Sequence, residues 1–231
     1  MRWNHPTRGV IGPDDFIPIA EDTGLIIDLG RFVLREACRQ TMRWRHLPGA
    51  EDLSVSVNVS PHQIYDDNFV TDVATALEES GLPATSLILE LTETALLTDA
   101  APVQQRLGAL QLTGVRIAID DFGTGYSSLA YLRSFAIDFL KIDRSFVNEL
   151  THGHRDQGRA MVRSIINIGR DLELHVIAEG IEEDTQLDVL RDAGCTTGQG
   201  YLFAKPAPAD QIPDVIRRSH QAQLASHRSD A

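Results

Sequence analysis

The chain has 231 residues, 42% of them apolar, which is enough for one domain with a sizeable core. Its 33 acidic and 21 basic residues give a net charge of -12, which disfavours unspecific binding to DNA, RNA or an anionic membrane. The two cysteines lie far apart, and neither a secretory leader nor an apolar run of the ~18 residues that span a membrane is found, so we expect reduced thiols and a cytoplasmic location.

Two helices are predicted at the start of the chain, over residues 13–22 and 31–44. A rhythm of strand followed by helix begins after them, and its strands are rich in β-branched and apolar residues on both faces. The predicted strands cover residues 53–59, 87–91, 115–120, 137–142, 174–178 and 200–204.

The helices between these strands have well-marked ends. Ser60 is a predicted N-cap, because Pro61 follows it at the first helical position and Gln63 stands three residues after it. Helices are also predicted over residues 69–79, 157–171 and 184–192. The first and last of these close on Gly81 and Gly194, where a left-handed C-terminal cap favours glycine.

Alternating strands and helices predict an α/β fold with a parallel sheet, either wound on both faces or closed into a barrel. A doubly wound nucleotide-binding sheet ordinarily carries a glycine fingerprint after its first strand, and neither GxGxxG nor GxxxxGK[ST] occurs here. A barrel instead places its chemistry at the carboxyl ends of many strands. We therefore expect a barrel.

Almost every predicted strand ends on a polar or charged residue. Taken singly, such residues can cap a helix, and this is the interpretation we give to Asp143. Taken together, they would crowd like charges at one end of a barrel unless cations compensate them. The set comprises Asn58, Glu90, Asp120, Asp121, Lys141, Glu179, Glu182 and Gln199.

Carboxylate and amide oxygens are the ligands that hard divalent cations prefer, which favours Mg²⁺ or Mn²⁺ at these strand ends. Two such ions ~4 Å apart, bridged by an aspartate, are the usual arrangement for attack of water on a phosphodiester. Asp120 is the expected bridging ligand. Lys141 would position that water or offset phosphate charge.

Three other interpretations are weaker. Asp121-Phe122-Gly123 matches the metal-binding triplet of protein kinases, but their glycine-rich and catalytic loops are missing. A metal site built from histidines is disfavoured, because the eight histidines are scattered and lack the spacing of metal ligands. An enolase-like barrel with Lys141 as the base would also use consecutive strand-end acids.

Several blocks of sequence together carry a family resemblance. NVSPHQ, ELTET, IAIDDFGTGYSSLAYLRSFAIDFLKIDRSFV, VIAEGIEE and GQGYLFAKP occur in this order, and the chain closely resembles EAL domains from Met1 to about residue 215. The resemblance implies a modified (β/α)₈ TIM-like barrel over residues 1–215, followed by a polar tail over 216–231. It also implies hydrolysis of cyclic di-GMP to linear pGpG with Mg²⁺ or Mn²⁺, in bacterial signal transduction.

The resemblance also implies roles for single residues. Arg2 would contact a substrate phosphate, Lys141 would hold the catalytic water, and Glu182 and Gln199 match further active-site positions. Glu93 and the loop 121–128 match a segment that couples metal binding to dimerisation. The implied metal-binding positions are Asn58, Glu90, Asp120, Asp121 and Glu179, and the loop includes Phe122, Gly123, Thr124 and Gly125.

The chain departs from the family at its beginning. The Glu-Ala-Leu signature, whose glutamate is a metal ligand, should stand just before Arg2-Trp3, but only Met1 precedes them. Six predicted strands are also two short of a closed barrel, so we expect the first one or two to be absent. Either Met1 is internal to a longer reading frame, which we favour, or the chain is shortened.

Two functions remain open at this point. The first is a cyclic di-GMP phosphodiesterase, for which the resemblance implies a homodimer and a preceding sensory or GGDEF domain. The second is a catalytically inactive module that binds cyclic di-GMP or a protein partner. The missing signature glutamate supports the second, because losing one hard ligand weakens a metal site.

Overall fold

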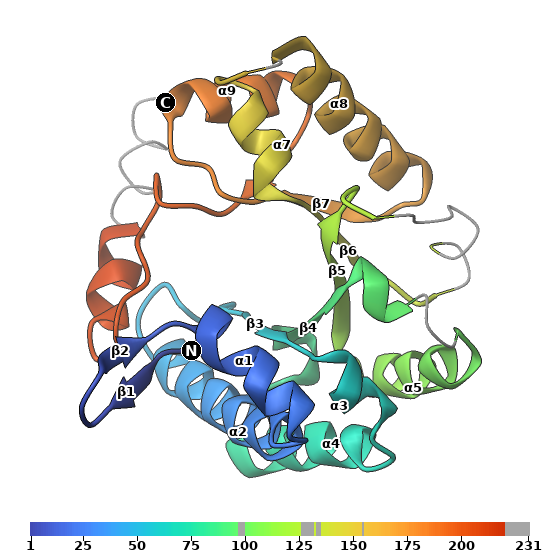
Figure 1. Ribbon diagram of the computed structural model, residues 1–231. Coiled ribbons are helices and arrows are strands. Elements are labelled where there is room, and N and C mark those ends of the chain that lie inside the picture. The colour runs from blue at the N-terminus through green and yellow to red at the C-terminus, as the bar shows by residue number, and fades with distance from the viewer. Residues whose placement is uncertain (97–99, 126–131, 133–134, 154, 220–231) are drawn as a thin grey trace.

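The computed structural model describes residues 1–96, 100–125, 132, 135–153 and 155–219 (Figure 1). At its centre six parallel strands pair in chain order and curl into a half-barrel, which confirms the α/β barrel-type fold expected from the sequence. The two edges of this sheet are its first and last strands. The strands are β3 (Val55–Asn58), β4 (Leu87–Thr92), β5 (Arg116–Phe122), β6 (Phe139–Ile142), β7 (His175–Ala178) and β8 (Thr197–Gly198).

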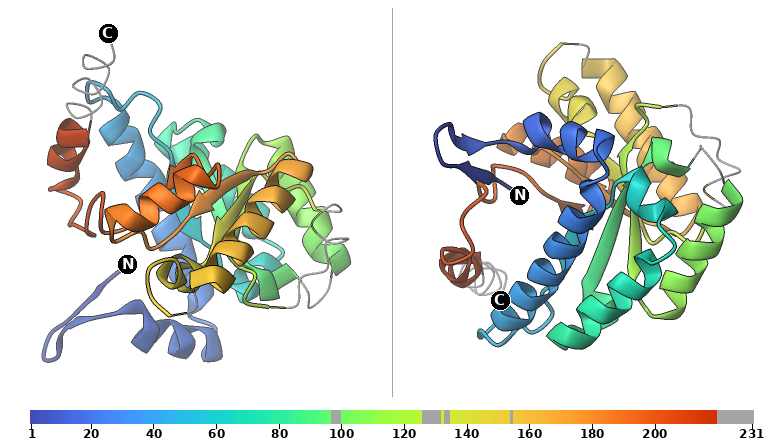
Figure 2. Two further views of the ribbon diagram at one scale, coloured as in Figure 1. Left: turned by 90° about the horizontal axis from the view of Figure 1, so that it is seen from above. Right: turned by 60° about the horizontal axis from the view of Figure 1, so that its bottom comes forward.

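Helices surround the outer, convex face of the sheet, as Figures 1 and 2 show. An antiparallel hairpin of β1 (Trp3–His5) and β2 (Gly9–Ile11) precedes them. The helices are α1 (Pro13–Asp22), α2 (Ile26–Arg45), α3 (Pro61–Tyr65), α4 (Phe69–Ser80), α5 (Ala100–Leu112), α7 (Arg144–Glu149), α8 (Arg155–Asp171) and α9 (Asp184–Asp192), with short 3-10 turns η1 (Ala84–Ser86) and η2 (Glu93–Leu96). Residues 212–219 form a last helix. In the part of the chain that the structure describes, no helix is long and apolar enough to cross a membrane.

The two faces of the sheet are built from alternate residues of the same strands. Leu89, Ile117 and Leu140 point to the convex face and are fully buried, where they pack with apolar residues of the covering helices. Their sequence neighbours Glu90 and Lys141 point to the concave face. The convex face is therefore the hydrophobic core, and the concave face carries the polar strand ends.

The helix ends follow the local signals of the sequence. Ser60 and Gln63 form a reciprocal capping box at the start of α3, and Gly81 closes α4 with a φ of 69°. Asp143 caps α7 by accepting a hydrogen bond from the backbone N–H of Ser145. These predictions are confirmed.

The predicted strand at residues 200–204 is wrong. The last strand of the described residues is β8, and residues 201–203 form a turn instead. The backbone N–H of Leu202 donates to the carbonyl oxygen of Ile181, and Gly200 lies so close to Ile181 that a side chain there would clash with its backbone. The apolar residues that suggested a strand thus belong to a turn packed against Ile181.

Candidate active site

The carboxyl ends of the central strands bring their polar residues to one edge of the sheet. Glu90 lies in β4 beside Asn58, its register partner at the end of β3. Asp120 and Asp121 lie near the end of β5, and Glu179 directly follows β7. The predicted convergence of these strand ends is therefore present in the structure.

Lys141, in β6, is at the centre of this edge. Its Nζ atom lies 2.8 Å from Oε1 of Glu90, 3.0 Å from Oδ1 of Asp120 and 2.6 Å from Oε1 of Glu179, and its side chain is only 3% exposed. Burial opposes the charged ammonium, but the attraction of the three carboxylates is stronger and raises the pKa of Lys141 above its ordinary value. Lys141 is therefore a buried cation shared by three acids.

One ammonium group cannot balance three carboxylates, and Glu179 shows the remaining imbalance. Its pKa is raised to about 7, because burial disfavours its charged form and because Asp120 and Glu90 repel it, while Lys141 acts in the opposite direction. This carboxylate therefore holds its proton to a higher pH than an ordinary glutamate does. The three carboxylates at this edge of the sheet thus exceed the positive charge that Lys141 supplies.

Asp121 lies in an uncommon backbone conformation beside Asp120. Its φ is 53°, and its N–H donates to Oδ1 of Asp120 over 3.1 Å. Burial, repulsion by Asp120 and a side-chain hydrogen bond with Asp143 raise the pKa of Asp121 to about 6. The carbonyl oxygen of Asp121 accepts from the hydroxyl group of Thr124 over 2.8 Å, which folds the following loop back onto it.

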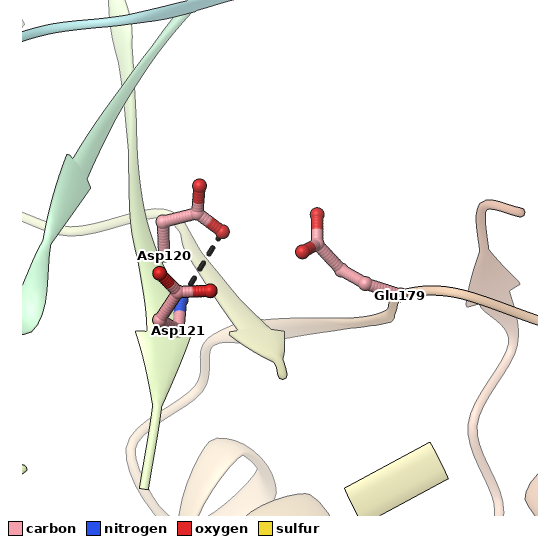
Figure 3. Close-up of side chains that lie close together, drawn as sticks. All are labelled: Asp120, Asp121 and Glu179. Carbon is pink, nitrogen blue, oxygen red and sulfur yellow. Dashed lines mark hydrogen bonds between the residues drawn. The ribbon is translucent and has the colours of Figure 1, made fainter. Parts of the chain in front are cut away.

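Asp120, Asp121 and Glu179 form a triad suited to a metal ion. Each offers one carboxylate oxygen, and these three oxygens lie within 4.8 Å of one another. Figure 3 shows the side chains of Asp120 and Glu179 directed toward each other. Three hard oxygen donors at an edge where carboxylates outnumber the one ammonium group fit a divalent cation such as Mg²⁺ or Mn²⁺.

Glu93 connects the end of β4 to the loop after β5. This carboxylate is buried, and its Oε2 atom accepts from the backbone N–H of Gly123 over 3.1 Å. Its other oxygen, Oε1, has no hydrogen-bond partner among the described residues. A side chain at Gly125 would place its Cβ 2.8 Å from that oxygen, so glycine allows the loop to approach Glu93 closely. Phe122 is buried at the end of β5, and residues 126–128 of the predicted loop lie outside the described residues.

The remaining predicted site residues divide into two groups. Gln199 joins the cluster formed by Lys141 and the acids around it, because its Nε2 atom donates to Oε1 of Glu179 over 2.7 Å. Arg2 and Glu182 are exposed, and within the described residues neither side chain forms a hydrogen bond or ion pair with the cluster.

One residue at the site was given only a capping role in the sequence analysis. Asp143 caps α7 and also bonds Asp121 through its side chain. The signal was present in the sequence, because Asp143 directly follows β6 and so stands at the same carboxyl end of the sheet as the other strand-end acids.

Comparisons with known proteins identify the family that this chain matches. The model of the EAL domain matches residues 1–206. The bifunctional diguanylate cyclase/cyclic di-GMP phosphodiesterase MucR of Pseudomonas aeruginosa is 44% identical over 92% of this chain and 30% of its own length. The cyclic di-GMP phosphodiesterase NbdA of the same organism is 44% identical over 94% of this chain and 27% of its own length. The chain thus spans less than a third of either relative.

Solved structures with the same fold include two in complex with cyclic di-GMP. The phosphodiesterase PaMucR in complex with c-di-GMP superposes with a TM-score of 0.87, is 44% identical, and is matched over 91% of this chain and 84% of that chain. The EAL enzyme Bd1971 with bound cAMP and cyclic di-GMP has a TM-score of 0.88 and 35% identity, over 93% of this chain and 58% of that chain.

Proposed function

The chain belongs to the EAL domain family, and from this premise we propose that it hydrolyses cyclic di-GMP to linear pGpG. Two similar proteins are named cyclic di-GMP phosphodiesterases, and similar structures hold that ligand. The observation that carries the proposal is the set of acids around Lys141. Such a set can hold cations against a doubly anionic substrate.

We assign the cation site to Asp120, Asp121 and Glu179, with Asn58 and Glu90 as further oxygen donors on the neighbouring strands. These five residues would hold the two ions of Mg²⁺ or Mn²⁺ expected from the sequence, with Asp120 as a ligand. Bound there, a divalent cation would lower the pKa of a water ligand and offset charge on the phosphodiester.

The protein's own groups would orient the reactants. All three carboxylates bonded to Lys141 also belong to the proposed donor set, so sharing their charge with a cation leaves an ammonium N–H for the attacking water or a phosphate oxygen. The oxygen of that water forms a bond to phosphorus and loses its proton to solvent, while one ester P–O bond breaks and the leaving oxygen takes up a proton from solvent. As a cation ligand Glu179 would be deprotonated, and Gln199 would hold its orientation.

Roles outside the cluster belong to the same proposal. Arg2 and Glu182 are exposed, and we assign them to contacts with the substrate rather than with the cation. The bond between Glu93 and Gly123 would couple the site to a homodimer contact through the loop after β5. We place the protein in the cytoplasm, in a gene product that also contains a sensory or GGDEF domain.

The test is turnover of cyclic di-GMP by the purified chain with Mg²⁺ or Mn²⁺, measured as formation of pGpG. Asp120→Ala and Glu179→Ala should each abolish turnover, whereas Glu78→Ala, which removes an exposed acid of α4, should not. Turnover that persists in the first two variants would refute the assignment.

A second candidate function is binding of cyclic di-GMP without hydrolysis. Lys141 already provides an internal cation for three acids, so the strand ends could keep their arrangement without metal. Saturable binding of cyclic di-GMP with no pGpG after long incubation in Mg²⁺ and Mn²⁺ would select this function over the first.

A further inference from the structure

We propose that Glu21, in the last turn of α1, is a positioning residue for the cation site. Its hydrogen bond to Ser60 fixes the chain that leaves β3 directly after Asn58. Glu21 has this role only if Asn58 is an oxygen donor for the cation, so the inference rests on the proposed function. It adds a residue of α1 to the strand-end groups described above.

The hydrogen bond joins two segments that lie 39 residues apart in the chain. The hydroxyl group of Ser60 donates to Oε1 of Glu21 over 2.6 Å, and both side chains are half-buried. A charged acceptor and partial removal from water both strengthen a hydrogen bond. The end of α1 is thus held against the end of β3.

Only Val59 separates Ser60 from Asn58. The N–H of Val59 donates to the carbonyl oxygen of Glu90 over 2.9 Å, and its side chain is buried in the core. Two residues of extended chain span only ~7 Å, so a displacement of Ser60 is passed on to Asn58 with little loss. The bond to Glu21 therefore acts on the position of a proposed cation ligand.

The capping role of Ser60 does not depend on Glu21. Its Oγ atom accepts from the N–H of His62 over 3.3 Å, and its own N–H donates to Oε1 of Gln63 over 3.2 Å. Gln63 is buried so close to Gly30 of α2 that a Cβ there would clash with its amide group. Losing the bond to Glu21 should thus leave the cap of α3 intact, which separates positioning from folding.

The stability of α1 does not explain an acid at this place. Glu21 and Asp22 end a helix whose last turn contains no basic residue. The partial negative charge at the carboxyl end of a helix disfavours carboxylates there. A residue that breaks a local rule without benefit to its own helix points to a role in another part of the fold, here the contact with Ser60.

Calorimetric titration with Mn²⁺ tests the inference without requiring turnover. Glu21→Ala should weaken Mn²⁺ binding about tenfold, as expected for the loss of a residue that orients a metal ligand. Glu21→Gln keeps an acceptor oxygen for Ser60 and should retain most of the affinity. Asp22→Ala removes the neighbouring exposed acid and is the matched control. Equal losses in Glu21→Ala and Glu21→Gln would show that charge acts here instead of the hydrogen bond.

A double-mutant cycle tests whether Glu21 acts through Asn58. Asn58→Ala should weaken Mn²⁺ binding by itself, and adding Glu21→Ala should then cause no further loss. Additive losses would overturn the proposal. Mn²⁺ binding that Glu21→Ala leaves unchanged would refute this inference alone, whereas an unaltered chain that binds no Mn²⁺ would refute the proposed cation site together with it.

Ser60 allows the same test from the other end of the bond. Ser60→Thr keeps the hydroxyl group and a good N-cap, so it should bind Mn²⁺ like the unaltered chain. Ser60→Ala should weaken binding as much as Glu21→Ala does, and the double variant should be no weaker than either. A loss in Ser60→Ala that Glu21→Ala does not share would mean that the cap of α3, and not Glu21, positions Asn58.

Discussion

The convex and concave faces of the half-barrel sheet use alternate residues of the same strands for opposite purposes. On the convex face Leu89 and Leu140 are fully buried under helices and contribute apolar burial. On the concave face their neighbours Glu90 and Lys141 are almost equally buried but charged. The strands thus combine a stabilising layer with a layer that costs stability unless its charges are balanced.

This difference predicts how the two faces respond to change. The convex face should be sensitive to lost volume, because a cavity removes contacts that nothing replaces. The concave face should be sensitive to lost charge, because an acid without its counter-ion is left in a poorly solvated place. Stability, cation binding and turnover measured on matched variants can separate the effect of lost volume from the effect of lost charge.

The largest effect is expected for Lys141→Met, which keeps the side chain's bulk and removes its charge. Leaving three buried carboxylates uncompensated should lower the free energy of unfolding by about 3–5 kcal/mol and abolish turnover. Added Mg²⁺ should restore more stability to this variant than to the unaltered chain, as urea unfolding would measure. Lys205→Met, at the only other lysine, is the control. An unchanged free energy of unfolding would show that Lys141 does not balance the acids.

A large effect on stability, caused by lost volume and not by lost charge, is expected for Leu89→Ala on the convex face. The cavity should lower the free energy of unfolding by about 2–5 kcal/mol. Because no charge is altered, the response of stability to Mg²⁺ should stay that of the unaltered chain, and turnover per folded molecule should persist. Leu112→Ala removes the same atoms from an exposed position and should change little. A changed Mg²⁺ response in Leu89→Ala would mean that the two faces are not independent.

The same contrast explains what the sequence could predict. Five of the central strands were found because their convex residues are apolar at every second position, and the strand ends were found because charges follow them. Helix α5 was missed, although Val103, Leu107 and Leu110 are buried, because apolar residues such as Leu112 also fall on its exposed side. The turn at residues 201–203 was mistaken for a strand because its contacts are with Ile181, far away in sequence.

For the site, sequence reasoning gave the residue types and their common edge, but not their bonds. The contacts of Lys141 with three acids depend on the curl of the sheet, which sets how far apart neighbouring strand ends lie. The bond between Gln199 and Glu179 likewise joins two loops whose paths no local pattern fixes. Residue type is a local property, whereas ion pairing is a property of the assembled edge.

A moderate effect of pH is expected on cation binding at the concave face. Glu179 must lose its proton to act as a ligand, and its pKa is raised to about 7, so the deprotonated fraction increases as the pH rises from 6 to 8. The apparent affinity for Mn²⁺ should therefore rise with pH by up to about tenfold per unit below that pKa. Calorimetric titration in two buffers of different ionisation enthalpy should reveal proton release, and Glu179→Gln should reduce it to the smaller release from Asp121, whose pKa is raised to about 6. An affinity that is equal at pH 6 and pH 8 would argue against Glu179 as a ligand.

The smallest effect on stability is expected at Gln199, where a neutral donor orients an acid that Lys141 already holds. Gln199→Met keeps a similar volume and removes the bond to Glu179, so the free energy of unfolding should change by less than about 1 kcal/mol, as for a single exposed hydrogen bond. Turnover should fall by about tenfold, because Glu179 loses its fixed orientation. Gln199→Glu adds a charge at the same place and should lower both the free energy of unfolding and turnover further. Gln157→Met, at an exposed position of α8, should change neither quantity. If the methionine and glutamate variants lost equal activity and equal stability, shape rather than charge would govern this edge, and the contrast between the faces would not extend to Gln199.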